Sequence, residues 1–170
     1  NTFSNVSEVI GQNGRRGATM ISIDCRHPDL EEFINIKNDL NAVTKANISV
    51  RITDDFMEAV VNKQDWNLFF ETEDGDVLIK TVKAHEIFRL LAKNNWSMAE
   101  PGILFWDRIE NYNLLSEDPN FHYAGVNPCA EEPLPNGGSC LLGSFNLVEY
   151  YDELTQTFDF QKFRADIPIV

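Results

Sequence analysis

The sequence predicts an α/β fold with mostly parallel central strands, because short strand-like runs alternate with helical apolar patterns along the chain. Strands are expected at 17–24, 47–52 and 102–106, and each of the first two is followed by a helical pattern. Strands joined through helices in this way are typical of a parallel sheet. The chain has 170 residues, of which 43% are apolar, and this is enough for the core of one globular domain.

The first elements are expected to be a helix, a strand and a second helix. Apolar residues recur at helical spacing from Phe3 to Ile10, which predicts an amphipathic helix. The β-type run of 17–24 follows a glycine-rich segment, and His27-Pro28-Asp29 then begins a helix with an apolar repeat of three to four residues. Later elements are expected to be a strand at 47–52, a helix capped by Thr53-Asp54-Asp55, a hairpin of 68–71 with 77–80, a helix at 84–93 and a strand at 102–106.

Composition excludes several classes of protein. Fourteen basic against 27 acidic residues give a net charge of −13, which argues against a nucleic-acid partner. No apolar run approaches the roughly 20 residues that cross a bilayer, and no leader pattern opens the chain, so we expect no membrane partner and a cytoplasmic location. Three cysteines make no secreted disulfide framework, and no Cys/His cluster suggests a metal site, so the interest of the thiols is redox.

The motif Asn127-Pro128-Cys129-Ala130-Glu131 carries the chemistry. Pro128 keeps Asn127 out of helical geometry, so the segment is expected to be a tight loop. Residues two apart on an extended loop face one side, which would direct Asn127, Cys129 and Glu131 into one pocket. Glu131, when ionised, can accept a proton from a hydroxyl group. The residues alone leave open a packed thiol beside a surface carboxylate, and no histidine near Cys129 supports a cysteine hydrolase.

Two basic segments are candidates for phosphate binding. Arg15 and Arg16 lie among the glycines of 11–17, and guanidinium groups with free backbone amides suit a phosphate. The segment matches neither common phosphate-loop pattern, so an ordinary turn remains the alternative. Lys37 and Lys45 bound a polar connection between a helix and a strand, for which a plain surface loop is the alternative.

These motifs together resemble the large catalytic subunit of ribonucleotide reductase, and most of all its adenosylcobalamin-dependent class II. The resemblance covers most of the chain and is weakest over 62–82. The segments that carry it are 14–18, 27–34, 47–50, 53–57, 100–105, 127–134 and 137–147.

The resemblance implies a role for each residue of the motif. Cys129 matches the cysteine that becomes a thiyl radical and removes the 3'-hydrogen of a ribonucleotide. Glu131 matches the carboxylate that takes the 3'-hydroxyl proton, and Asn127 the carboxamide that holds the substrate hydroxyls. Cys140 matches one of the two reducing cysteines. The fold implied is about half of a ten-stranded α/β barrel, with its finger loop near 125–133. An eight-stranded barrel takes roughly 250 residues, or about 30 for each strand and helix, so a chain of this length supplies about half of a ten-stranded one.

The resemblance also implies cofactors and partners. These are adenosylcobalamin, a ribonucleoside di- or triphosphate, a thioredoxin-like reductant, and dNTP or ATP effectors near Arg15, Arg16, Lys37 and Lys45. The second reducing cysteine lies upstream in the family, and Cys25 falls too late to replace it, so Cys25 is expected to be a packed residue. We therefore expect residues 1–170 to be a partial barrel domain that works in an oligomer with other reductase polypeptides.

Three rival interpretations remain. A class I large-subunit fragment would use a separate metal-containing radical subunit. A half-barrel that only binds nucleotide would leave two thiols without a role. A glycyl-radical or other thiol enzyme would not require Glu131 and Cys140 at this spacing together with the upstream segments.

Overall fold

The computed structural model describes residues 2–10, 17–75 and 77–169. The chain divides into two compact units, residues 1–138 and residues 139–170. No helix within the described ranges is long and apolar enough to cross a membrane.

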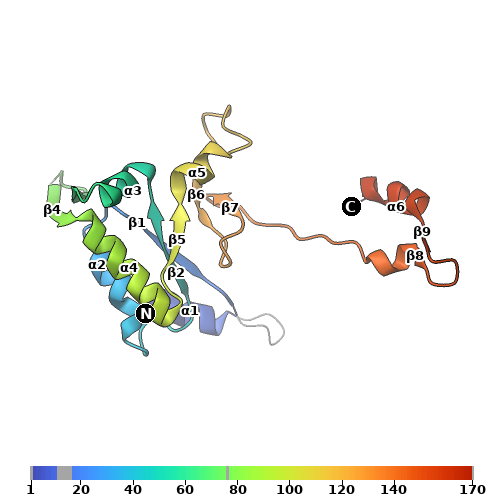
Figure 1. Ribbon diagram of the computed structural model, residues 1–170, viewed down its shortest axis with the longest axis horizontal. Helices are drawn as coiled ribbons and strands as arrows, with labels where there is room; N and C mark the ends of the chain where they lie inside the picture. The colour runs from blue at the N-terminus through green and yellow to red at the C-terminus, as the bar shows by residue number, and fades with distance from the viewer. Residues whose placement is uncertain (1, 11–16, 76, 170) are drawn as a thin grey trace. The chain divides into compact units, whose positions relative to one another are not determined.

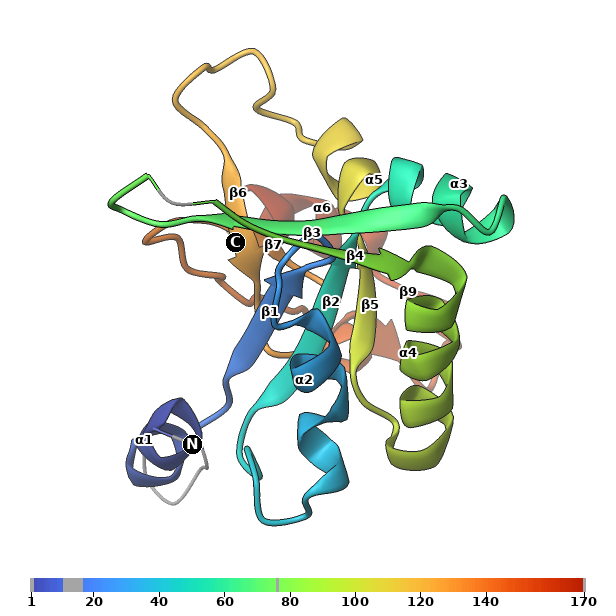
Figure 2. The same cartoon turned by 90° about the vertical axis from the view of Figure 1, so that its left-hand side faces the viewer.

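The first unit is organised around a three-stranded parallel sheet of order β1-β2-β5. Its strands are β1 (Met20–Asp24), β2 (Asn47–Ile52) and β5 (Gly102–Phe105). Met20 pairs with Asn47, and Ser49 pairs with Gly102. Helices α2 (Leu30–Asn35) and α4 (Ala84–Met98) cover one face of the sheet, as Figures 1 and 2 show. The prediction of parallel strands alternating with helices is confirmed, and within the described residues this sheet is open rather than closed.

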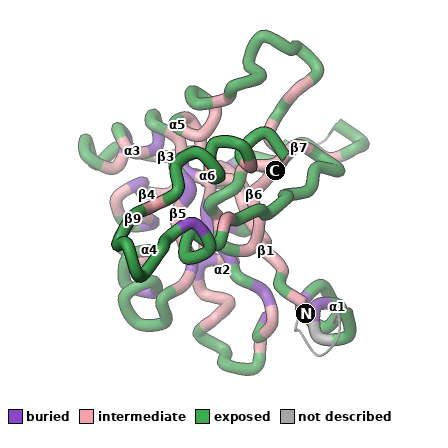
Figure 3. The backbone as a smooth tube through the Cα atoms, turned by 90° about the vertical axis from the view of Figure 1, so that its right-hand side faces the viewer, coloured by how far each residue is buried: buried purple, intermediate pink, exposed green. Residues whose placement is uncertain are grey.

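The core lies between the sheet and its helices. Ile48, Val50 and Ile52 of β2 are at most 2% exposed, and burying each such side chain stabilises the fold by about 1.5–3 kcal/mol. Buried residues are drawn in purple in Figure 3. The main cluster contains Val50 and Ile52 together with Cys25, Leu30, Ile34, Phe56, Ala59, Leu68, Ala84, Ile87 and Leu91, whereas Ile48 packs with Val43 and Ala46. Because successive strand residues point to opposite faces, Asn47, Ser49 and Arg51 belong to the sheet face away from these helices.

The segment between β2 and β5 adds a helix and a long hairpin. Helix α3 (Asp54–Val61) follows Thr53, but the Asp54 amide donates to Oδ2 of Asp107 at 2.7 Å, and Thr53 makes no side-chain cap. Strands β3 (Asp65–Glu71) and β4 (Val77–Lys83) pair antiparallel, as expected, and extend beyond the predicted hairpin. Helix α4 continues past the predicted end at 93 to Met98, and Trp106 begins helix α5 (Trp106–Asn111) rather than ending β5.

Helix α1 (Thr2–Val9) forms as predicted, but its apolar residues do not pack. Phe3 is 71% exposed and Val9 is 85% exposed, whereas Ser4 and Ser7 are buried. The serines find polar partners: Oγ of Ser4 accepts from the Lys45 amide at 2.8 Å, and Oγ of Ser7 contacts Oγ1 of Thr19. Amphipathic spacing therefore predicted the helix but not the face that packs.

The last part of the first unit is a short antiparallel pair, β6 (Tyr123–Val126) and β7 (Pro133–Pro135). The turn between them carries the cysteine motif. A 3-10 turn at Ile36–Asn38 ends the α2 region and begins the connection to β2.

The second unit is built on aromatic contacts. It contains short strands β8 (Tyr151–Asp152) and β9 (Thr157–Phe158), helix α6 (Phe160–Asp166), and 3-10 turns at Leu147–Tyr150 and Ile167–Ile169. The rings of Tyr150, Phe158 and Phe163 lie 5.3–5.9 Å apart. The Tyr150 hydroxyl donates to Asp166 at 2.9 Å. Phe163 meets both other rings edge to face, and such pairs are favourable beyond the area that they bury.

Candidate functional site

The cysteine motif forms a tight turn between β6 and β7. The Asn127 amide donates to the Glu132 carbonyl at 3.0 Å, and the Ala130 amide donates to the Asn127 carbonyl at 3.0 Å. Ala130 adopts a φ of 68°, a left-handed conformation that an extended loop would not contain. Cys129 is exposed at this turn.

Asn127 and Glu131 are paired through the turn. Nδ2 of Asn127 donates to Oε1 of Glu131 at 2.6 Å, while Oδ1 of Asn127 accepts from the Glu132 amide at 3.1 Å. The two bonds fix which way the carboxamide faces. The expected proximity of Asn127 and Glu131 is therefore found, but it comes from chain reversal and not from the alternation of an extended segment. Glu131 is exposed to solvent, so its second oxygen remains accessible.

One further residue reaches the motif from the sheet. Nδ2 of Asn47, the first residue of β2, donates to the Pro128 carbonyl at 2.8 Å. In the sequence, Asn47 belongs to an expected strand and to one of the segments that carry the family resemblance, and neither indicates a contact with the motif. An asparagine at a strand end has many ordinary roles, and the partner lies 81 positions away in the chain, so no local signal could have identified this contact.

The Lys37–Lys45 connection lines a cavity of about 470 Å³ together with Gly17, Thr19, Asn47 and Glu100. Nζ of Lys37 donates to the carbonyls of Val43 at 2.7 Å and Ala46 at 2.8 Å. It also forms an ion pair with Oε2 of Glu100 at 2.8 Å. Lys37 and Lys45 thus lie at one cavity, whereas Arg15 and Arg16 fall outside the described residues.

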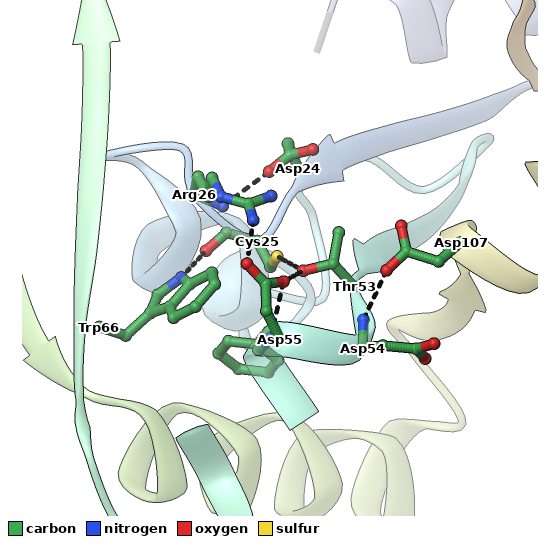
Figure 4. Close-up of polar contacts among 9 residues, drawn as sticks. Asp24, Cys25, Arg26, Thr53, Asp54, Asp55, Trp66 and Asp107 are labelled. Atoms are coloured by element: carbon green, nitrogen blue, oxygen red, sulfur yellow. Dashed lines mark hydrogen bonds and ion pairs between the residues drawn. The ribbon is translucent and has the colours of Figure 1, made fainter. Parts of the chain in front are cut away.

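Cys25 is in a different environment from Cys129. It is fully buried, and its sulfur lies 3.7 Å from Oγ1 of Thr53 in the polar group drawn in Figure 4. Burial first, and then the charge of Asp24, raise the pKa of the Cys25 thiol to about 11. A neutral buried thiol packed in the core agrees with the prediction that Cys25 is a structural residue.

The polar group around Cys25 ties the carboxyl ends of β1 and β2 to the hairpin. Nε1 of Trp66 donates to the Cys25 carbonyl at 2.9 Å, and Arg26 lies 5.0 Å from the Trp66 ring centre and 2.5 Å from Asp55. Burial raises the pKa of the Asp55 carboxyl, but the hydrogen bond from Thr53 and the charge of Arg26 outweigh it and leave the pKa below its usual value. In these contacts the charged groups of Arg26 and Asp55 have a structural role.

Cys140 belongs to the second unit, where it is exposed. It lies in a stretch without regular secondary structure before the aromatic cluster. Across 2–10, 17–75 and 77–169, no group of three or more His, Cys, Asp and Glu side chains is arranged to hold a metal ion.

The fold and the turn first define a class: an α/β protein with an open parallel sheet and a thiol-bearing turn beside a carboxamide–carboxylate pair. A family model described as the barrel domain of ribonucleotide reductase matches residues 1–170. The chain belongs to this family, and an unclosed α/β sheet agrees with part of such a barrel.

Curated relatives carry the same family name. The chain is 35% identical over 167 residues to a vitamin B12-dependent ribonucleoside-diphosphate reductase of Thermoplasma acidophilum, covering 97% of this chain and 21% of that protein. It is 31% identical to a vitamin B12-dependent ribonucleotide reductase of Streptomyces clavuligerus, covering 92% of this chain and 18% of that protein. The chain is 31% identical over 148 residues to a vitamin B12-dependent ribonucleoside-diphosphate reductase of Mycobacterium tuberculosis, covering 86% of this chain and 21% of that protein. The chain thus spans about a fifth of the length of these relatives.

Proposed function

We propose that this chain supplies the thiol-bearing part of an active site that reduces ribonucleoside di- or triphosphates to 2'-deoxyribonucleotides. The observation that carries the proposal is the exposed Cys129 on a turn where Asn127 donates to Glu131 at 2.6 Å. A nucleotide sugar presents adjacent hydroxyls, and a thiol, a carboxylate and an oriented carboxamide on one turn suit them. Membership of the family places ribonucleotides first among such substrates.

Each residue has one task in the proposed reaction. The Cys129 thiyl radical takes the hydrogen atom from C3', so that an S–H bond forms and the C3'–H bond breaks. Glu131 accepts the 3'-hydroxyl proton, and Asn127 holds the hydroxyl groups in register. The 2'-hydroxyl leaves as water, and Cys140 and a second thiol outside this chain are oxidised to a disulfide. Two thiols thus supply the two electrons, and Cys129 returns its hydrogen atom to C3'.

The exposed thiol of Cys129 suits a reaction that a cobalamin cofactor would start. Adenosylcobalamin, when bound, supplies the organic radical from which the Cys129 thiyl radical derives. Cys129 is solvent-exposed and can be reached from outside the turn. We assign the holding of the cofactor mainly to reductase segments outside residues 1–170, because the chain covers 21% of the Thermoplasma relative.

Regulation and completion of the site are also part of the proposal. We propose that dNTP or ATP effectors bind at the cavity of about 470 Å³ that Lys37 and Lys45 line, and influence the choice of base from there. Because the sheet is open and the chain covers 21% of the Thermoplasma relative, we propose that other reductase segments or polypeptides complete the barrel, with a thioredoxin-like reductant renewing the thiols. Copurification tests this: a monomeric, fully folded 170-residue chain that recruits no partner would contradict it.

The thiol assignments are tested by two substitutions in the assembled enzyme. Cys129→Ser is expected to abolish both reduction and release of tritium from 3'-labelled substrate, while nucleotide binding is retained. Cys140→Ser is expected to abolish reduction but to keep the 3'-hydrogen step. Cys25→Ala is the matched control, since its thiol is buried in the core, and it should retain turnover. Turnover by Cys129→Ser would overturn the radical assignment.

A further inference from the structure

Asn47 connects two parts of the candidate site. Its backbone amide donates to the Thr19 carbonyl at 2.8 Å, which holds it at the start of the sheet. Its side chain donates to the Pro128 carbonyl at 2.8 Å, within the turn that carries Cys129. We propose that Asn47 is a positioning residue that couples the connection at 39–46 to the Cys129 thiol. This inference rests on the proposed function.

The contact acts at the peptide bond before Cys129. The Pro128 carbonyl and the Cys129 amide belong to one planar unit, so fixing the oxygen restricts the orientation of the Cys129 backbone. The other hydrogen bonds of the turn, from Ala130 to Asn127 and from Asn127 to Glu132, are made within the motif itself. Asn47 links this planar unit to the sheet, so it helps to fix where the turn lies relative to β2.

Lys37 helps to hold the connection before Asn47 in place. The three N–H donors of the Lys37 ammonium match three protein oxygens, those of Val43, Ala46 and Glu100. The side chains of Lys37 and Glu100 are only 16% and 23% exposed, so solvent screens this pair less than a surface pair. Lys37 therefore helps to hold the connection, and its carbonyl partner Ala46 immediately precedes Asn47.

The cavity gives this arrangement a regulatory consequence. Asp39, Leu40, Ala42, Thr44 and Lys45 line it, and so does Asn47. A nucleotide that binds there and shifts the connection would move Asn47, and with it the Pro128 carbonyl. Occupancy of the cavity would thereby be transmitted to the thiol as a change in position, through residues that are in direct contact.

Asn47→Ala in the assembled reductase tests the positioning role. The variant should lower kcat by about tenfold to a hundredfold, as expected for a thiol displaced by a fraction of an ångström to about 1 Å, and leave KM within about twofold. Asn47→Asp keeps the volume but has no N–H donor, so it should match Asn47→Ala. Asn67→Ala is the control, because Asn67 lies on strand β3 of the hairpin with an exposed side chain and should leave kcat unchanged. An unchanged kcat in Asn47→Ala would overturn the inference.

Hydrogen exchange separates this inference from the proposed function. In Asn47→Ala the amides of Asn127 and Ala130 should exchange faster than in the unsubstituted protein, whether or not the enzyme turns over. Glu100→Gln should also accelerate their exchange, but not when added to Asn47→Ala, because the path through Asn47 is then already broken. Additive effects of the two substitutions would exclude the coupling. Changed exchange without any ribonucleotide reduction would instead contradict the proposed function alone.

Discussion

At the scale of single residues, two cysteines of one chain have opposite properties because of their surroundings. Cys25 has no exposed surface and lies in the main core cluster, whereas Cys129 is exposed on a turn. Thiol chemistry requires access and thiolate character, and burial removes both. Cys25 therefore packs in the core, whereas the thiol of Cys129 is available for reaction.

Thiol labelling measures this difference. In the folded protein, an alkylating reagent at neutral pH is expected to modify Cys129 and Cys140 and to leave Cys25 unmodified. Under denaturing conditions all three cysteines should react. Mass spectrometry of the peptides distinguishes the sites, and rapid native modification of Cys25 would contradict its buried position.

The raised pKa of Cys25 also predicts an alkaline loss of stability. The folded-state pKa is about 11 against an ordinary value of 9.0, so the unfolded chain loses its proton first as the pH rises. Stability from the neutral thiol is complete below pH 9 and is lost as the pH approaches 11, by on the order of 2 kcal/mol. Urea unfolding of the protein and of Cys25→Ala across this range should show a steeper decline for the former. An equal decline of stability with pH in the two proteins would contradict the raised pKa of Cys25.

Residue-level prediction succeeded where the signal was local. Asn127 and Glu131, four positions apart, were expected to lie close together and do so, although through a turn and not through the alternation of an extended loop. Asn47 shows the opposite case, since its partner Pro128 is distant in sequence and only folding brings the two together. The roles of Cys129, Glu131, Asn127 and Cys140 stay predictions until the substitutions are made.

At the scale of elements, helix α4 ends at a residue in a conformation that its side chain disfavours. Ala99 has φ 59° and ψ 11°, and its amide donates to the Asn95 carbonyl at 2.7 Å. A left-handed end of this kind usually carries glycine, because a Cβ atom crowds the following carbonyl oxygen. This end explains why the helix stops at Met98 but not why the sequence pattern suggested 93.

Ala99→Gly is therefore expected to stabilise the protein by about 0.5–1 kcal/mol. The matched control is Ala92→Gly, the same change at an exposed interior position of α4, which should destabilise it by about 0.5–1 kcal/mol. Thermal unfolding of the two variants should shift in opposite directions. Destabilisation by Ala99→Gly would contradict the strained cap.

Strands were predicted more accurately than the packing of helices. The strand at 47–52 was predicted with the bounds that β2 has, because its alternation is strong and Thr53 and Asp54 favour a helix start. Helix α1 was predicted from Phe3, Val6, Val9 and Ile10, yet its serines are buried. Periodicity reports which residues share a face, while polar partners outside the strands, Thr19 before β1 and Lys45 in the connection before β2, decide which face packs.

At the scale of the whole molecule, the chain comprises two separately packed units joined through an exposed stretch. Residues 136–144 are all exposed, and Leu141 and Leu142 are 96% and 90% exposed. Exposed leucines beside glycines, without regular structure, are favoured sites of proteolysis. Cys140 lies in this stretch.

Limited chymotrypsin digestion of the chain is expected to cut first near Leu141 or Leu142. Assembly with the remaining reductase parts should slow this cleavage, since we propose that Cys140 then faces the substrate within a completed barrel. Fragment masses over time provide the measurement. Equal cleavage rates before and after assembly would count against the completed site, whereas a first cut within β2 or α4 would contradict the described fold.

The sequence alone determined the α/β class, the order of most elements, the thiol motif and the family, because these depend on local spacing and on short motifs. The tertiary structure decided that Asn127 and Glu131 meet through a turn, that Cys25 is buried, and that Lys37 binds Val43, Ala46 and Glu100. It also placed Asn47 against Pro128. The contacts of Lys37 with Glu100 and of Asn47 with Pro128 join residues distant in sequence, and the burial of Cys25 depends on the packed core, so none of these can be read from neighbouring residues. The contact of Asn127 with Glu131 is local, but it requires a chain reversal that the expected extended loop does not contain.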